Sequence, residues 1–249
     1  MSNSHAVVVG GSKGLGLLVT DSFLARGMNV TVLSRTPASQ HVGNTRLRHV
    51  HVDLAQMASI QAALDGLRAT LPGNGLSYLV LCQRYRGDDD PWTGEIQVGL
   101  TASRQLIEGL TDSFSETGDR AIGIVSSVYA RFVGSSQPVG YHVVKAGLNA
   151  MVRYYAFSLG QRGIRINAIM PLTYMKDTSR AYYQSQARLM ALYDQLVPLR
   201  RMGDAADSAN ALDFLCSEKA SFISGQCLYV DGGVSAVWPE EIAKRFQDP

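Results

Sequence analysis

The chain alternates short apolar runs with longer segments whose apolar residues recur at helical spacing. The segment 15–26, for example, repeats Leu15, Val19 and Phe23 every four residues and predicts a helix. Strands separated by helices in this way are typical of βαβ units, which right-handed crossovers join into a parallel sheet. We expect strands at 6–9, 30–33, 47–52, 76–82, 121–125, 164–169 and 227–230, and helices at 15–26, 60–71, 96–110, 141–159 and 204–216. The pattern therefore predicts the α/β class: a single-domain, Rossmann-like, doubly wound parallel sheet flanked by helices on both faces.

Two segments interrupt this alternation. Residues 84–91 form a charged loop directly after an apolar strand. Residues 172–199 form a long insertion that contains Tyr174 and three further tyrosines. Long ordered insertions in a compact domain are often lids or binding elements. We therefore expect one domain over 1–249 with a substrate lid at about 172–199, and a solvated pair of amphipathic helices is the alternative.

Composition narrows the class of protein. The 249 residues are 46% hydrophobic and 18% charged, which is ordinary for a globular protein with a sizeable core. The net charge of +2 argues against a nucleic-acid surface built on bulk charge. The 3 cysteines have no CxxC spacing, so we expect neither a disulfide framework nor a metal site. The sequence indicates no membrane span and no signal peptide, and we expect a cytoplasmic protein.

A glycine-rich turn follows the first expected strand and leads directly into a helix. Its spacing is GxxxGxG, with glycines at Gly10, Gly14 and Gly16. Glycines permit a tight turn and a close approach of backbone to phosphate, and the helix N-terminus supplies free N–H groups for a pyrophosphate. The turn therefore predicts a dinucleotide site, in which Ser12, Lys13 and Leu15 also take part.

The end of the second strand indicates which dinucleotide binds. A site that prefers NAD carries an acidic side chain here for the ribose 2′-hydroxyl, whereas this chain has Ser34 and Arg35. Arg35 can bind a 2′-phosphate through charge-assisted hydrogen bonds, and Lys13 can reach the same group. We therefore predict NADP(H) as the cofactor; in the alternative, both bases are ordinary surface residues.

A tyrosine and a lysine lie four residues apart in the expected helix 141–159. Tyr141 and Lys145 share one face of that helix. An ammonium beside a phenol favours the phenolate, so Tyr141 is a candidate general acid for carbonyl reduction. Ser127 follows a strand and can bind the substrate oxygen. A serine, a tyrosine and a lysine in this order predict Ser127, Tyr141 and Lys145 as the catalytic residues.

These motifs resemble those of the short-chain dehydrogenase/reductase family, in its short, single-domain, 3-oxoacyl reductase-like form. The resemblance runs from Val7 to Gly233 and includes Asp53 after the third strand. It implies that Asp53 and Leu54 meet the adenine, that Lys145 binds the nicotinamide ribose, and that Pro171 lies near the nicotinamide. It also implies a homodimer or homotetramer built on the helices 96–110 and 141–159.

The chain departs from the family pattern at several positions. Gln83 and Arg84 stand where the family has Ala and Gly, Gly99 replaces an active-site Asn, and Leu172 replaces a Gly after Pro171. Val9 replaces the Thr that precedes the first glycine. One hypothesis is that Arg84 or Arg86, with Tyr174, binds an anionic substrate group. In the alternative, the two arginines pair with Asp88–Asp90 at the surface.

The sequence therefore predicts an NADPH-dependent oxidoreductase that transfers hydride between nicotinamide and a carbonyl or secondary alcohol, with a polar or anionic ketone favoured as substrate. Two alternatives remain open. One is a reductase of 3-oxoacyl thioesters carried by acyl carrier protein. The other is a non-catalytic NADP(H)-binding sensor or scaffold, which the changes at Gly99, Gln83 and Arg84 would favour.

Overall fold

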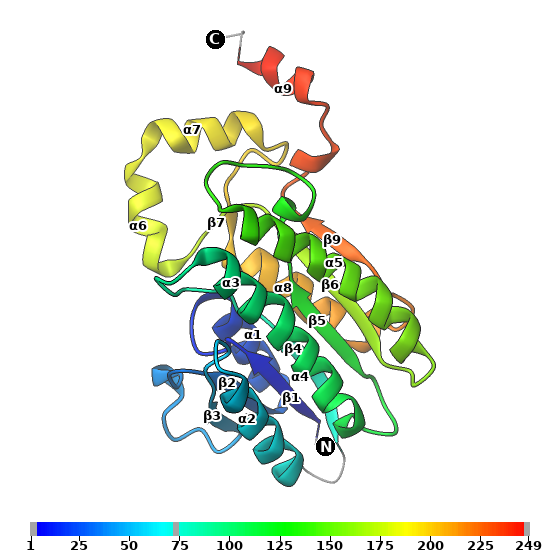
Figure 1. Ribbon diagram of the computed structural model, residues 1–249. Coiled ribbons are helices and arrows are strands. Elements are labelled where there is room, and N and C mark those ends of the chain that lie inside the picture. The colour runs from blue at the N-terminus through cyan, green and yellow to red at the C-terminus, as the bar shows by residue number, and fades with distance from the viewer. Residues whose placement is uncertain (1–3, 72–74, 247–249) are drawn as a thin grey trace.

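The computed structural model describes residues 4–71 and 75–246. Seven strands pair in parallel to form one sheet, in the order β3–β2–β1–β4–β5–β6–β9 (Figure 1). Their bounds are β1 His5–Val9, β2 Asn29–Ser34, β3 Leu47–His51, β4 Leu76–Leu81, β5 Ala121–Val125, β6 Arg165–Pro171 and β9 Cys227–Val230. The strand order reverses between β1 and β4, which makes a topological switch point at their carboxyl ends. The prediction of a doubly wound parallel sheet is confirmed.

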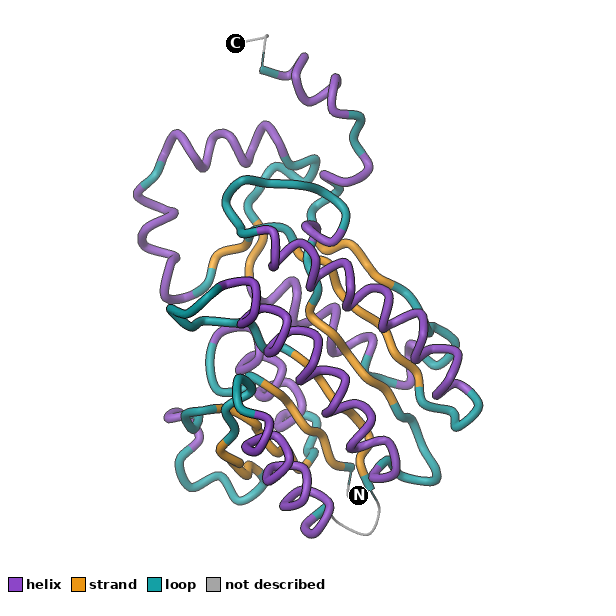
Figure 2. Tube along the Cα trace, in the orientation of Figure 1, coloured by secondary structure: helices purple, strands orange, loops and turns teal. Residues whose placement is uncertain are grey.

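Helices cover both faces of the sheet, as the continuous apolar strands require. Figure 2 shows the strands enclosed between the two helical layers. On one face, α2, α4 and α5 enclose a core that includes Leu79, Leu106 and Val152. On the other face, α1 and α8 pack together over a core that includes Phe23 and Leu212. The bounds are α1 Gly14–Ala25, α2 Met57–Thr70, α4 Ala102–Leu110, α5 Val139–Gly160 and α8 Ala205–Leu215.

The helix expected at 96–110 begins earlier than the apolar pattern indicates. It starts as α3, Pro91–Glu95, passes through a π-helical turn and continues as α4. The Asp90 carboxylate caps α3 by accepting hydrogen bonds from the N–H groups of Trp92 and Thr93, and Pro91 is favoured at the first helical position. The wider π turn covers Ile96–Thr101, a geometry that frequently occurs at functional sites.

Gly99 lies in this π turn, and packing explains its lack of a side chain. A Cβ atom there would lie 2.3 Å from Cγ1 of Val144 on α5, which is far inside van der Waals contact. Gly99 therefore lets the π turn approach α5, the helix that carries Tyr141 and Lys145. The departure from the family pattern at this position serves the close packing of the two helices.

The insertion folds into two helices at the carboxyl end of the sheet. It contains β7, Tyr174–Met175, followed by α6, Asp177–Ser185, and α7, Ala187–Leu196. β7 pairs in parallel with β8, Gly203–Asp204. Figure 1 shows α6 and α7 extending away from the sheet beyond α3, on the side where α9, Pro239–Arg245, also projects. A role as substrate lid stays a prediction.

Candidate active site

The glycine turn joins β1 to α1 and is held by backbone contacts that exclude side chains. Gly10 has φ of 74°, a left-handed conformation that favours glycine. A Cβ atom on Gly16 would lie 2.2 Å from the carbonyl oxygen of Gly10. The Thr20 hydroxyl donates to the carbonyl oxygens of Gly11, at 3.1 Å, and Gly16, at 3.0 Å. Thr20 thus supplies the turn with a hydroxyl even though Val9 replaces the usual threonine.

The geometry of this turn fits a pyrophosphate. A Cβ atom on Gly14 would have no atom within 4 Å, so the backbone there faces open space. The first turn of α1 contains no acidic residue that would repel an anion. The helix N-terminus contributes free N–H groups and the positive end of the helix dipole. Lys13 precedes α1 and is exposed, while Ser12 and Leu15 are buried in the turn.

The residues expected to bind the adenosine half lie at the carboxyl ends of β2 and β3. Ser34 is the last residue of β2 and pairs in register with His51 of β3. Arg35 follows Ser34 and is exposed. Asp53 follows β3, where its carboxylate accepts a hydrogen bond from the N–H of Ala55 at 3.0 Å. The fold thus brings both segments to the edge of the sheet that carries the glycine turn.

Ser127, Tyr141 and Lys145 meet at this edge. Ser127 follows β5 and lies close enough to Tyr141 to lower the pKa of its phenol. Nζ of Lys145 lies 5.4 Å from the centre of the Tyr141 ring and donates to the carbonyl oxygen of Val125 at 2.8 Å. The neighbouring Ser126 hydroxyl donates to the carbonyl oxygen of Lys145 at 3.1 Å, so the end of β5 holds this part of α5 in place.

Burial controls the pKa values of the tyrosine and the lysine. It raises the pKa of Tyr141, whereas the hydrogen bond from Ser127 and the charge of Arg84 lower it. Burial also lowers the pKa of Lys145 to about 8. The expectation that Lys145 lowers the pKa of the phenol stays a prediction, and a buried lysine is less readily protonated than an exposed one. Arg84 also supplies a positive charge that acts on Tyr141.

Arg84 turns into the site. Its guanidinium carbon lies 4.8 Å from the centre of the Tyr141 ring, and its side chain donates a hydrogen bond to Gln137. In the described part of the chain, no ion pair joins Arg84 or Arg86 to Asp88–Asp90, so the surface-pairing alternative is wrong. The Gln83 side chain instead points toward α4, where its amide donates to the Ser103 hydroxyl at 2.8 Å, while its backbone lies against Gly10 of the glycine turn.

Pro171 and Tyr174 border the same region. Pro171 ends β6 opposite Val230. The next residue, Leu172, continues the pairing, because its N–H group donates a hydrogen bond of 3.2 Å to the Val230 carbonyl oxygen. The chain therefore does not need a glycine at this position. Burial raises the pKa of Tyr174 to about 12, and the charges of Arg86 and Arg84 act against this rise, which places Tyr174 in their field.

Two further residues, Glu95 and Tyr129, belong to the site and were not among the residues predicted from the sequence. Glu95 is 4% exposed at the end of α3, where its carboxylate interacts with the charges of Arg84 and Lys145. Tyr129 lies edge-on to Tyr141, with ring centres 6.2 Å apart. A signal for Glu95 exists in its position directly before the mostly apolar segment 96–100, where a carboxylate interrupts a buried helix face. Tyr129 gives no such signal.

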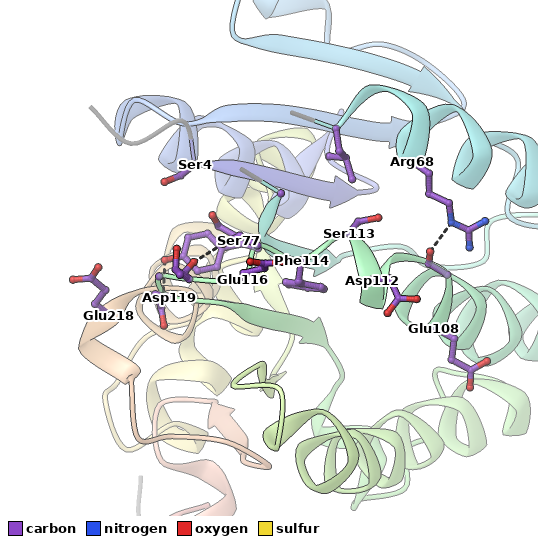
Figure 3. Close-up of a pocket in the computed structure, with 17 residues that line it drawn as sticks. Ser4, Arg68, Ser77, Glu108, Asp112, Ser113, Phe114, Glu116, Asp119 and Glu218 are labelled. Atoms are coloured by element: carbon purple, nitrogen blue, oxygen red, sulfur yellow. Dashed lines mark hydrogen bonds between the residues drawn. The ribbon is translucent and has the colours of Figure 1, made fainter. Parts of the chain in front are cut away.

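A hollow of about 1090 Å³ lies at the opposite edge of the sheet. It surrounds the amino ends of β4 and β5, and Figure 3 shows Ser77, Asp119 and Glu218 among its lining residues. Glu108, Asp112 and Glu116 also line it, so its charge repels an anionic cofactor. None of the expected site residues faces this hollow, and the described residues contain no group of three His, Cys, Asp or Glu side chains placed to hold a metal ion.

The family model described as enoyl-(acyl carrier protein) reductase matches residues 9–235. The chain belongs to the short-chain dehydrogenase/reductase family. Members of this oxidoreductase family are enzymes of hydride transfer. In this chain the match spans the glycine turn, the three catalytic candidates and the insertion. No described helix has the length and apolar character needed to cross a membrane.

Individual relatives act on different substrates. The 3-oxoacyl-[acyl-carrier-protein] reductase FabG of Salmonella typhimurium is 29% identical over 93% of this chain and 97% of its own length. Isoepoxydon dehydrogenase patN of Aspergillus clavatus is 24% identical over 94% of this chain and 95% of its own. The solved structure of a short-chain type dehydrogenase/reductase from Mycobacterium ulcerans has a TM-score of 0.82 and 25% identity, covering 95% of this chain and 90% of that chain.

Proposed function

We propose that this chain is an NADP(H)-dependent reductase of a ketone, or dehydrogenase of the corresponding secondary alcohol, with Ser127, Tyr141 and Lys145 as its catalytic residues. The supporting observation is that the Tyr141 ring lies 5.4 Å from Nζ of Lys145 and near Ser127, at the edge of the sheet that carries the glycine turn. A proton donor would thus lie next to the proposed dinucleotide site.

The residues at this edge would hold the cofactor in three groups. The turn would take the pyrophosphate, the ends of β2 and β3 the adenosine half, and α5 with the end of β6 the nicotinamide ribose and ring. The pyrophosphate would contact Gly10, Ser12, Gly14, Leu15 and Gly16. The adenosine half would contact Lys13, Ser34, Arg35, Asp53 and Leu54. The nicotinamide ribose and ring would contact Tyr141, Lys145 and Pro171. When bound, the nicotinamide ring supplies or accepts the hydride, which is chemistry that protein side chains lack.

The protein's part of the reaction is proton transfer and orientation. Tyr141 would donate its phenolic proton to the substrate oxygen as negative charge develops there. Ser127 would hold that oxygen through its hydroxyl. Lys145, fixed to the Val125 carbonyl, would stabilise the phenolate that remains on Tyr141. The raised pKa of Tyr141 keeps the phenol protonated at neutral pH, which suits a proton donor in the direction of reduction.

The proposal includes a cytoplasmic homodimer or homotetramer that forms through the faces of α4 and α5. Tyr154 and Phe157 on α5 are 67% and 80% exposed, which is unusual for aromatic side chains of a monomer. A second copy that packs helix against helix here would bury them. A sedimentation measurement gives the oligomeric state, and Phe157→Glu should shift it toward the monomer.

A single-turnover assay tests the function. Enzyme in excess over NADPH is mixed with a panel of ketones that includes a 3-oxoacyl thioester, and the absorbance of the reduced nicotinamide is followed. Loss of absorbance with a simple ketone supports the proposal, and selective loss with the thioester supports the FabG-like alternative. Tight NADPH binding with no turnover of any ketone supports the sensor or scaffold alternative.

A further inference from the structure

Three basic side chains from two separate segments lie around Tyr174, and one of them, Arg84, also lies over the ring of Tyr141. Arg84 and Arg86 follow β4, and Lys176 follows β7. The pKa of Lys176 is lowered first by burial and then by the charges of Arg86 and Arg84, so the three cations lie within one another's field. Nζ of Lys176 lies 5.7 Å from the centre of the Tyr174 ring, which places the lysine on the same side of the site as Tyr174.

The protein itself does not balance these charges. No acidic side chain of the described residues forms an ion pair with Arg84, Arg86 or Lys176. The carboxylate of Asp90 is occupied as the cap of α3. The buried carboxylate of Glu95 interacts with the charges of Arg84, Lys145 and Arg86. Its one negative charge is shared among these three cations, and like charges gathered in this way are unfavourable without an anion.

Arg84 also carries a hydrogen-bond donor that the protein leaves unsatisfied. Its Nε atom is buried and has no partner, although another nitrogen of the same guanidinium donates to Gln137. A buried donor without a partner costs free energy, and an acceptor on a bound ligand would remove that cost. A guanidinium presents its N–H groups as a planar fork that matches the two oxygens of a carboxylate or a phosphate.

We propose that Arg84, Arg86 and Lys176 form a binding site for a carboxylate or phosphate group of the substrate, so that the enzyme acts on a ketone bearing an anionic group near the reacting carbon. This inference rests on the proposed function and names the substrate class for it. Because Arg84 lies over the ring of Tyr141, an anion bound there holds the rest of the molecule next to the phenol. Lys176, at the start of the insertion, links the anion to the segment expected to act as a lid.

The first arm of the test measures anion binding without turnover. Inorganic phosphate and acetate, each a probe of one chemistry, are titrated calorimetrically into enzyme saturated with NADP⁺, so that the cofactor site is already filled. We expect binding of at least one probe to the wild type, and a loss of affinity of tenfold or more in Arg86→Gln and in Lys176→Gln. Arg46→Gln, which changes an arginine remote from the site, should bind like the wild type. Absence of binding to the wild type, or equal binding by all variants, would overturn the inference.

The second arm measures discrimination during catalysis. Oxo carboxylates with the ketone two, three or four carbons along the chain are compared with their own methyl esters. We expect kcat/KM to favour an acid over its ester by tenfold or more, and the preference to fall at least tenfold in Arg84→Gln and Arg86→Gln. Equal use of acid and ester rejects the anion site. If these variants bind NADPH more weakly but keep the preference for the acid over its ester, the cations serve the cofactor. That result also rejects the anion site. If no ketone is reduced, the proposed function fails, while the phosphate and acetate titrations still decide the anion site.

Discussion

The ammonium of Lys145 lies 5.4 Å from the centre of the Tyr141 ring, one turn further along α5. Lys145 is 4% exposed, and burial lowers its pKa to about 8. Close to neutrality, the charge of this lysine therefore depends on its neighbours. Glu95 favours the ammonium, whereas Arg84 opposes it. The buried carboxylate that the sequence analysis missed thus maintains the protonation of a proposed catalytic residue.

Removal of this carboxylate should shift the pH dependence of the reaction. In Glu95→Gln the pKa of Lys145 falls below about 8, since the charge that raised it is gone. The limb of the kcat/KM profile that requires the ammonium should then move to lower pH. Profiles of the wild type, of Glu95→Gln and of the exposed control Glu116→Gln measure this shift. A profile of Glu95→Gln that overlays the wild type, or moves to higher pH, would show that Glu95 does not act on Lys145.

Selectivity for NADP(H) over NAD(H) should depend on Arg35, the basic residue that follows β2. Arg35 is exposed at the end of this strand, where a 2′-phosphate would form charge-assisted hydrogen bonds with it. Such bonds contribute about 1.5–3 kcal/mol each, so Arg35→Ala should weaken NADPH binding by roughly tenfold or more. NADH binding should change little. Fluorescence titration of both cofactors measures the two dissociation constants, with Arg46→Ala as the control. Equal dissociation constants for NADPH and NADH in the wild type would be evidence against NADP(H).

Two glycines should respond in opposite directions to the same substitution. Gly16→Ala drives a Cβ atom to 2.2 Å from the Gly10 carbonyl oxygen, so the turn must open, at a cost of roughly 2 kcal/mol or more. Gly66 lies inside α2, and a Cβ atom there meets nothing within 4 Å. Gly66→Ala should therefore stabilise the protein by about 0.5–1 kcal/mol through its helix propensity. Urea unfolding of both variants tests this pair. A Gly16→Ala protein as stable as the wild type would contradict the close contact in the turn.

The sequence predicted the parts of the fold that local pattern determines. The expected helix at 204–216 differs from α8, Ala205–Leu215, by one residue at each end, because its apolar positions face the sheet directly. The start at Pro91 was missed although Asp90 and Pro91 form a recognisable helix cap. Apolar periodicity is weak in Pro91–Glu95, and this weakness concealed the signal.

The site was harder to predict, since it depends on where side chains point. The choice of Ser127, Tyr141 and Lys145 needed only the order of motifs along the chain, and the fold then brings the three together. The orientation of Arg84 toward Gln137 rather than toward Asp88–Asp90 is a tertiary contact between segments that lie 53 residues apart. The pKa of Tyr141 likewise follows from burial, which no spacing of residues reveals.

The central role of Tyr141 is tested most directly by Tyr141→Phe, which removes only the phenolic oxygen. Tyr155→Phe is the matched control on the same helix, since the Tyr155 hydroxyl donates to Glu108 at 2.8 Å and lies outside the site. The single-turnover rate of NADPH oxidation by a ketone should fall by roughly 10²–10⁴-fold in Tyr141→Phe, the contribution of a general acid. The NADPH dissociation constant should rise by about tenfold at most, since one lost hydrogen bond to the ribose costs about 0.5–1.5 kcal/mol. Tyr155→Phe should react at the wild-type rate, and a Tyr141→Phe protein that reduced the ketone at that same rate would contradict the proposed catalysis.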